Sequence, residues 1–324
     1  MATNKHDLTT YSTPQRGSVS SRAKIIAVGG GKGGVGKSFV SSNIAIFLAN
    51  MGYKTVLVDL DLGAANAHTT LGEGLPKLGI SDFLKGRVKT LEEIAVATSQ
   101  TNLRLISDSH ADIDAANVSL EQLCTLMSAL FNFETDYLVL DLSAGTHQST
   151  IDFFLMAQHH LVVFTPEPSS IENAYRFMKS SFFRKVKRFE KQLGLEQSIK
   201  ELMEQQEEQQ IRHPADLVTA LLKREPERGQ NLVEVLNSLQ FNIILNQTRI
   251  HKDIEIGHSV QSVSNKFFGI PARFIGHLDY DNAVWQSLRK RKPLLVEYPH
   301  SRLYTQILNI SKSIAYSNRY KAVI

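Results

Sequence analysis

The residues best suited to chemistry lie in one glycine-rich stretch near the start of the chain. Residues 29–38 read GGGKGGVGKS and follow an apolar run at residues 25–28. Within this stretch, residues 31–38 match the pattern G-x-x-x-x-G-K-[ST] of a phosphate-binding loop, or P-loop. Backbone N–H groups of such a loop curl around phosphate oxygens, and the following helix directs its positive N-terminal end at the same anion. The sequence therefore predicts a nucleotide site built from a strand, a glycine loop and a helix.

Individual residues of this loop have distinct expected roles. Lys37 is expected to reach the β- and γ-phosphates of ATP, and the Ser38 hydroxyl to bind Mg²⁺. Lys32 is a second lysine that a simple P-loop does not need, so it marks a subclass of these sites. The residues expected to contact the nucleotide here are Gly31, Gly33, Gly34, Val35, Gly36, Lys37, Ser38 and Phe39.

Three carboxylates follow apolar runs that predict buried strands. Asp59 and Asp61 end the run TVLVDLD and stand two residues apart, so both lie on the same side of the strand. The carboxyl ends of strands line the ligand crevice of an open parallel sheet. One of the two aspartates can therefore hold the water shell of Mg²⁺ while the other orients the attacking water. Asp141 ends the run YLVLD, a Walker-B pattern, and is expected to bind Mg²⁺ through water.

Composition limits the class of protein further. The chain has 324 residues, a formal net charge of +4 and a single cysteine, Cys124. One cysteine excludes an internal disulfide framework and any cluster held by several cysteines of one chain. No apolar run reaches transmembrane length and the N-terminus lacks a signal-peptide hydrophobic segment, so we expect a soluble cytoplasmic protein.

Short apolar runs alternate with helical stretches from Lys24 onward. This alternation predicts an α/β fold, a doubly wound and mostly parallel sheet with helices on both faces. The helix after the P-loop is expected at about 37–51, with its apolar positions on one face. Strands are predicted at residues 24–29, 54–60, 102–107, 136–142, 160–165, 241–246 and 272–277.

Domain organisation is expected to be simple. Residues 1–22 are rich in Ser, Thr and Asn without periodicity, which predicts a disordered leader. Residues 23–324 are expected to form a single P-loop ATPase domain. Within it, residues 174–240 lack a strand pattern, and they predict a helical insertion between two strands of the sheet.

The three motifs, in this order, resemble the deviant-Walker-A ATPases of the MinD/ParA family. The resemblance rests on KGGVGKS at 32–38, DLDLGAAN at 59–66 and DLSAG at 141–145. TPEPSS at 165–170 resembles the T-x-E segment of the family, and Asn246 looks like its adenine-contacting asparagine. Within the family, the DLDLGAAN run and residues 284–293 are most similar to the FlhG/FleN branch.

The resemblance implies a fold of the SIMIBI type and a slow, Mg²⁺-dependent ATPase that acts as a nucleotide switch. ATP would bring two subunits into a face-to-face homodimer, with Lys32 of each reaching the phosphates bound by the other. Asp61 matches the water-activating aspartate of the family, and Asp59 its companion. A protein activator or cargo is also implied, in cell division, flagellar placement, or the partition of chromosomes or other cargo.

Some alternatives remain open at this point. The stripe at residues 303–314 predicts core packing, with peripheral docking on the inner membrane as the alternative. The basic clusters 184–188 and 289–292 predict solvated helix faces, with non-specific contact to nucleoid DNA as the alternative. The alternative function is an ATP-dependent biosynthetic enzyme of the same superfamily, of the amide-ligase type.

Overall fold

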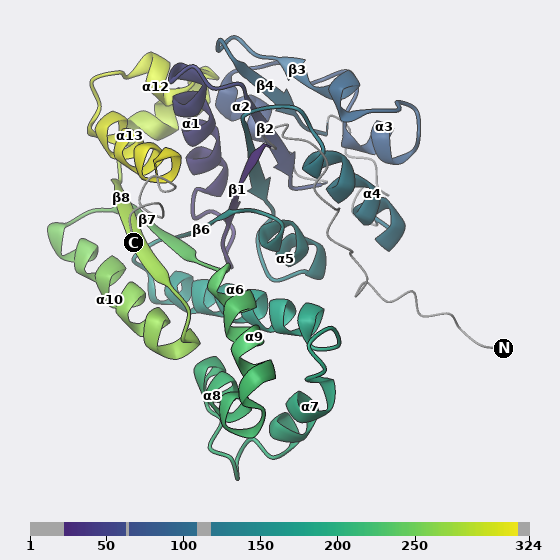
Figure 1. Cartoon of the computed structure of the whole chain (residues 1–324). Helices are drawn as coiled ribbons and strands as arrows, with labels where there is room; N and C mark the ends of the chain where they lie inside the picture. Colours follow the sequence, from purple (N-terminus) through teal and green to yellow (C-terminus); the bar gives the residue numbers. More distant parts are fainter. Residues whose placement is uncertain (1–22, 63–64, 109–117, 317–324) are drawn as a thin grey trace.

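The side chains of the P-loop strand point alternately into two separate apolar cores. In β1 (Lys24–Gly29), Ile25 and Ala27 face one core, and Ile26 and Val28 face the other. A strand that is apolar on both faces has to be covered on both sides, as in a parallel sheet between helices. The computed structural model describes residues 23–62, 65–108 and 118–316, and helices cover both faces of its sheet (Figure 1).

Within the described residues, eight strands form one sheet in the order β3-β4-β2-β5-β1-β6-β7-β8. Neighbouring strands are parallel except for the edge pair β3/β4. The P-loop strand β1 therefore lies in the middle of the sheet, between β5 and β6. The other strands are β2 (Thr55–Leu60), β3 (Val96–Ala97), β4 (Leu103–Ile106), β5 (Tyr137–Leu142), β6 (His159–Phe164), β7 (Phe241–Thr248) and β8 (Ala272–Asp279).

The predicted doubly wound, mostly parallel sheet is confirmed. Every predicted strand is present, with ends displaced by at most two residues. The sequence does not predict the antiparallel edge strand β3, because its two residues are exposed and too few to show an alternation of apolar and polar side chains. The helices are α1 (Lys37–Asn50), α2 (Ala67–Leu71), α3 (Ile80–Leu84), α4 (Leu120–Phe131), α5 (Gln148–Leu155), α6 (Pro168–Phe189), α7 (Glu196–Glu204), α8 (Pro214–Arg224), α9 (Pro226–Asn237), α10 (His251–Phe268), α11 (Asn282–Lys290), α12 (Leu294–Glu297) and α13 (Arg302–Ala315).

The helix after the P-loop is buried on nearly all sides, whereas the sequence predicts a one-sided apolar face. α13 causes this difference, because it lies beside α1 on the same face of the sheet, over β8, and covers a flank of α1 (Figure 1). The rings of Phe47 and Tyr304 meet edge to face with centroids 5.0 Å apart. The stripe of α13 belongs to the same core and is buried, which confirms core packing for Leu303, Ile307, Ile310 and Ile314.

Four helices, α6 to α9, lie between β6 and β7, in the interval where the sequence predicts a helical insertion. The basic cluster of α6 is mostly engaged inside the protein. Arg184 and Arg188 both bind the buried carboxylate of Asp152 in α5, at 2.6 to 2.9 Å. The Lys185 ammonium donates to the Ser238 hydroxyl at 2.6 Å, and Lys187 pairs with Glu190.

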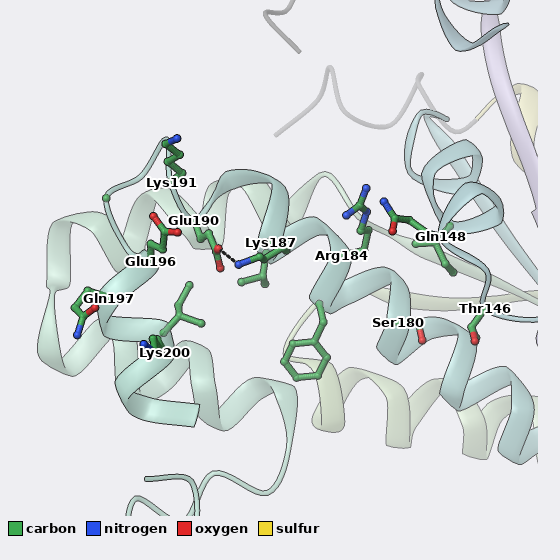
Figure 2. A pocket seen from close by; sticks show the side chains of 15 residues that line it. Thr146, Gln148, Ser180, Arg184, Lys187, Glu190, Lys191, Glu196, Gln197 and Lys200 are labelled. Carbon is green, nitrogen blue, oxygen red and sulfur yellow. Dashed lines mark hydrogen bonds and ion pairs between the residues drawn. The ribbon is translucent and has the colours of Figure 1, made fainter. Parts of the chain in front are cut away.

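The prediction of a solvated face for residues 184–188 is therefore wrong. A DNA contact there is disfavoured, because these basic side chains already bind partners within the protein. Figure 2 shows Arg184, Lys187 and Glu190 beside a broad groove between α5, α6 and α7. Among the described residues, none from the P-loop lines this groove. The predicted leader, residues 1–22, lies outside the described part of the chain. No helix of the described segments is both long and apolar enough to cross a bilayer.

A buried histidine in β6 makes the fold sensitive to acid. The ring of His160 is fully buried, 5.1 Å from the ring of Phe154, and burial lowers the pKa of His160 to about 3. The pKa of an unfolded histidine is about 6.5, so the unfolded chain binds the extra proton between these values. Stability from this group is complete above the unfolded pKa and is lost as the pH falls toward the folded pKa.

We expect acidification from about pH 7.5 to about pH 5 to cost about 2 kcal/mol of unfolding free energy through His160. In His160→Phe this loss should disappear, as measured by urea unfolding at both pH values. The exposed His300 provides a control, since His300→Phe should retain the wild-type pH dependence. An undiminished acid sensitivity in His160→Phe would contradict the assignment.

Candidate nucleotide-binding site

The glycine loop leads from β1 into α1, and the first N–H groups of that helix are left open. Gly36 is the N-cap residue, with φ at 91°, and no side chain caps the helix. No acidic residue lies in the first turn of α1. A Cβ at position 36 would lie 2.2 Å from Nδ2 of Asn246, so glycine is required there. Uncapped N–H groups at the positive end of a helix fit a phosphate.

The remaining loop residues divide into an exposed and a buried set. Gly33 and Gly34 are exposed at the tip of the loop, where a ligand can reach their N–H groups. Val35 and Phe39 are buried and anchor the loop to the core beneath it. Gly31 is held against α6, since a Cβ there would lie 2.0 Å from the Asn173 carbonyl oxygen. The predicted contact residues therefore surround one cradle.

Asp141 and Lys37 form the buried charged centre of this cradle. Asp141 is only 1% exposed, and neither carboxylate oxygen has a hydrogen bond of normal geometry with a described residue. Burial and the neighbouring Asp59 raise the pKa of Asp141 to about 7. Burial lowers the pKa of Lys37, and the negative charges of Asp141 and Asp61 partly oppose this lowering. These charge interactions place Lys37 close to both carboxylates.

Within the described segments, only the nearby Ser38, Lys37 and Ser41 stabilise the charge of this buried carboxylate, and a bound cation or water would lower the cost of burying it. Asp141 therefore fits Mg²⁺ held through water, beside the hydroxyl of Ser38. Among the described residues, no group of three or more His, Cys, Asp or Glu gathers to hold a metal ion by itself. Mg²⁺ keeps several waters and takes other ligands from the phosphates of a nucleotide, so a carboxylate and a hydroxyl of the protein can hold it.

Asp59 has a structural task that the sequence did not reveal. Its carboxylate accepts backbone N–H groups from Asp61 at 3.1 Å, Asn66 at 2.8 Å and Ala67 at 2.9 Å. Asp59 thereby holds the N-terminus of α2 against the end of β2. It also lies opposite Asp141 in the β2/β5 register. Its expected part in the water shell of Mg²⁺ remains a prediction. Asp59 would have to bind such a water while it also accepts the three backbone N–H groups.

Asp61 follows β2 and is only partly buried, whereas Asp59 is almost fully buried. Its carboxylate stands close enough to Lys37 to oppose the lowering of the Lys37 pKa by burial. The structure therefore brings Asp61 to the phosphate end of the cradle. A partly open carboxylate in this place can hold a water molecule and align it for in-line attack.

Lys32 points away from its own phosphate cradle. Its ammonium donates to Oε2 of Glu167 at 2.9 Å and to the Ser169 hydroxyl at 3.0 Å. Both partners follow β6, which neighbours β1 in the sheet. Lys37, by contrast, turns inward and reaches the backbone carbonyl of Lys32 at 3.3 Å. The two lysines of this loop thus point in different directions: Lys37 lies within the cradle, and Lys32 contacts the segment after β6.

Sequence reasoning noted the TPEPSS segment but not its contact with Lys32. The signal available was the position of that segment after a strand expected to lie near the P-loop. A second missed contact joins the loop after Asp141 to the P-loop, because Gly145 donates its N–H to the Gly30 carbonyl at 3.4 Å. This bond ties the loop after β5 directly to the P-loop.

Asn246 lies behind the P-loop at the end of β7. Its Nδ2 donates to the Val35 carbonyl at 2.8 Å, and its Oδ1 accepts the N–H of Gln247 at 2.9 Å. Gln247 also reaches the Gly34 carbonyl, at 3.4 Å. Both residues therefore brace the glycine loop, and an adenine contact by Asn246 remains a prediction.

Comparison with known proteins identifies the family of this site. The family model described as "ParA: NUBPL iron-transfer P-loop NTPase" matches residues 21–213, more than half of the chain. The protein belongs to the ParA family of P-loop NTPases. The iron transfer in that description is not carried over, because the single cysteine leaves no C-x-x-C pair for a cluster.

Individual relatives agree with the family. Antiactivator FleN of Pseudomonas aeruginosa is 27% identical over 281 residues, covering 86% of this chain and 81% of FleN. Flagellum site-determining protein YlxH of Helicobacter pylori is 37% identical over 160 residues, so the chain spans about half of its length. MinD of Pyrococcus horikoshii, solved as a complex with Mg-ADP, has the same fold, with a TM-score of 0.62 and 19% identity over 93% of this chain and 100% of that MinD.

These findings confirm the predicted family: the protein is a P-loop NTPase of the ParA family. The MinD of Pyrococcus horikoshii, which has the same fold, holds Mg-ADP. ATP and Mg²⁺ are the cofactors predicted for this chain. Ser38 and Asp141 are the residues that would hold Mg²⁺, and the ion would supply charge stabilisation to the phosphates. The residues of this chain are expected to hold the phosphates, orient the water and position the loop. The roles given above to single residues remain predictions for mutagenesis.

Proposed function

We propose that this ATPase is a switch that forms a face-to-face homodimer when ATP binds and dissociates after slow hydrolysis. The ATP state presents a surface to a protein partner, and the machinery that the partner serves is positioned or regulated through that surface. We propose a cytoplasmic location, at the periphery of the inner membrane or the nucleoid. An activating partner accelerates hydrolysis and resets the switch.

The position of Lys32 carries this proposal. A lysine in a phosphate-binding loop that faces away from its own cradle is available to phosphates bound elsewhere. In a face-to-face dimer it supplies positive charge to the nucleotide of the other subunit, where charge develops during phosphoryl transfer. Hydrolysis and dimerisation then depend on each other, which is what a switch requires.

The relatives support the kind of task. Their names describe an antiactivator, a flagellum site-determining protein and septum site-determining proteins. The site-determining names describe control of where a larger structure forms, and the name antiactivator describes regulation. They favour a spatial or regulatory switch over the amide-ligase alternative.

Sedimentation velocity tests the switch directly. The variant Asp61→Ala, which retains ATP, should sediment as a dimer with ATP and Mg²⁺ and as a monomer with ADP and Mg²⁺. A monomer under both conditions would contradict the proposal.

The contact of Lys32 with Glu167 and Ser169 competes with any role of Lys32 in a dimer. In Glu167→Gln combined with Ser169→Ala, Lys32 is released, so ATP-dependent dimerisation should strengthen. The gain should be no more than about fivefold, because both charged groups are exposed and such pairs are weak. Sedimentation equilibrium with ATP measures the dimer dissociation constant.

Glu172→Gln offers a matched control, since Glu172 forms an exposed pair with Arg176 on the same helix. It should leave the dimer dissociation constant unchanged. A weaker dimer in the Glu167→Gln, Ser169→Ala variant would show instead that these residues assist dimerisation.

A further inference from the structure

The two basic clusters of the chain have different surroundings. In residues 184–188 the cations are held by partners within the protein, as described above. In residues 289–292, two of the four cations share one carboxylate, because Lys290 and Lys292 both pair with Glu297, at 2.6 and 3.4 Å. Arg289 lies over the ring of Trp285 instead, 5.1 Å from its centroid. This second cluster therefore keeps an excess of positive charge at the surface.

Large apolar side chains are exposed within the same cluster. Trp285 is 61% exposed, Leu288 is 37% exposed, and Val296 of the adjoining α12 is 53% exposed. Trp285, Leu288 and Arg289 stand three and four residues apart, so they share one face of α11. Among the residues of α11, only Ser287 is buried. The helix is therefore a ridge on the surface, with a tryptophan and arginine on its outer side.

We propose that the outer face of α11, together with Val296, docks on a membrane surface containing anionic lipids. Tryptophan and leucine fit the boundary between headgroups and acyl chains, and clustered Lys and Arg are attracted to anionic headgroups. Docking of this surface on a membrane does not require the proposed ATP-dependent switch.

The combination of groups favours lipid over other occupants. DNA binding rests mainly on phosphate contacts and does not require exposed Trp285, Leu288 and Val296. A peptide that lies along a protein needs a groove, whereas α11 is a ridge. The apolar stripe of α13 is not available for this task, because it is buried in the core.

Trp285 is the single tryptophan of the chain, so its fluorescence reports on this site alone. The whole protein, without nucleotide, is titrated with vesicles of equal parts phosphatidylglycerol and phosphatidylcholine. The emission should shift to shorter wavelength, and the protein should float with the vesicles. Vesicles of pure phosphatidylcholine should produce neither effect.

Charge reversal tests the site. Arg289→Glu combined with Lys292→Glu should weaken vesicle binding at least about tenfold, since each basic residue near an anionic membrane contributes appreciably. Lys191→Glu combined with Lys200→Glu makes the same change in net charge on exposed residues of the insertion, and should leave binding within about twofold. Circular dichroism verifies that both variants fold.

Three results would overturn the proposal. The first is an unchanged emission spectrum with phosphatidylglycerol vesicles. The second is an equal loss of vesicle binding in both double variants, which would show that net charge alone is responsible. The third is a spectral shift caused by a short DNA duplex or by self-association, but not by vesicles.

Discussion

Lys37→Ala is expected to weaken ATP binding at least about a hundredfold. The Lys37 ammonium is buried beneath the glycine loop, close to the carboxylates of Asp141 and Asp61. A nucleotide bound in the cradle gains charge-assisted hydrogen bonds from this group, and each is worth about 1.5–3 kcal/mol. Isothermal titration with ATP and Mg²⁺ measures the loss.

Lys32→Ala is the control for this experiment, because it removes a lysine from the same loop that does not face the cradle. It should retain appreciable ATP binding. Thermal unfolding without nucleotide verifies that both variants fold. Unchanged ATP affinity in Lys37→Ala would refute the assignment of the cradle to phosphate.

Asp61→Ala should stop hydrolysis while leaving ATP binding intact. Its carboxylate is placed to orient the attacking water, and positioned groups of this kind contribute about 10²- to 10⁴-fold to the rate. Single-turnover hydrolysis of ATP measures the chemical step, and isothermal titration measures binding. Asp61→Asn should be as inactive, since it retains the size of the side chain but loses its basicity. Hydrolysis at the wild-type rate in either variant would contradict the assignment.

Asp59 should behave differently from Asp61, although the sequence pairs the two. Asp59 accepts three backbone N–H groups, so its loss leaves buried donors without partners and loosens the start of α2. The difference arises from the path of the chain after β2. A two-residue spacing alone does not contain that information.

The sheet and the P-loop could be predicted because each depends on short segments with strong local patterns. Apolar runs identified the strands, and the order of motifs along the chain placed Lys37, Asp61 and Asp141 at one edge of the sheet. Parallel pairing then brought them together, since the carboxyl ends of the strands meet there. At these positions the local sequence pattern was therefore enough to predict the place of each residue in the fold.

The partners of isolated charges could not be predicted, because they come from segments far apart in the sequence. Asp152 binds Arg184 and Arg188 more than thirty residues later. Lys32 binds Glu167 across an interval of 135 residues. A basic cluster has the same sequence pattern whether its cations are paired or free, so residues 184–188 and 289–292 could not be distinguished. The burial of α1 on both sides likewise depended on where α13 packs.

The central claim is that Lys32 acts on the nucleotide of a second subunit. Sedimentation velocity with ATP and Mg²⁺, comparing Asp61→Ala with the double variant Lys32→Ala, Asp61→Ala, tests it most directly, because hydrolysis cannot reset either protein. Isothermal titration first establishes that both bind ATP. The account predicts a dimer for Asp61→Ala and a monomer for the double variant. If the double variant dimerises as well as Asp61→Ala, the cross-subunit role of Lys32 is contradicted.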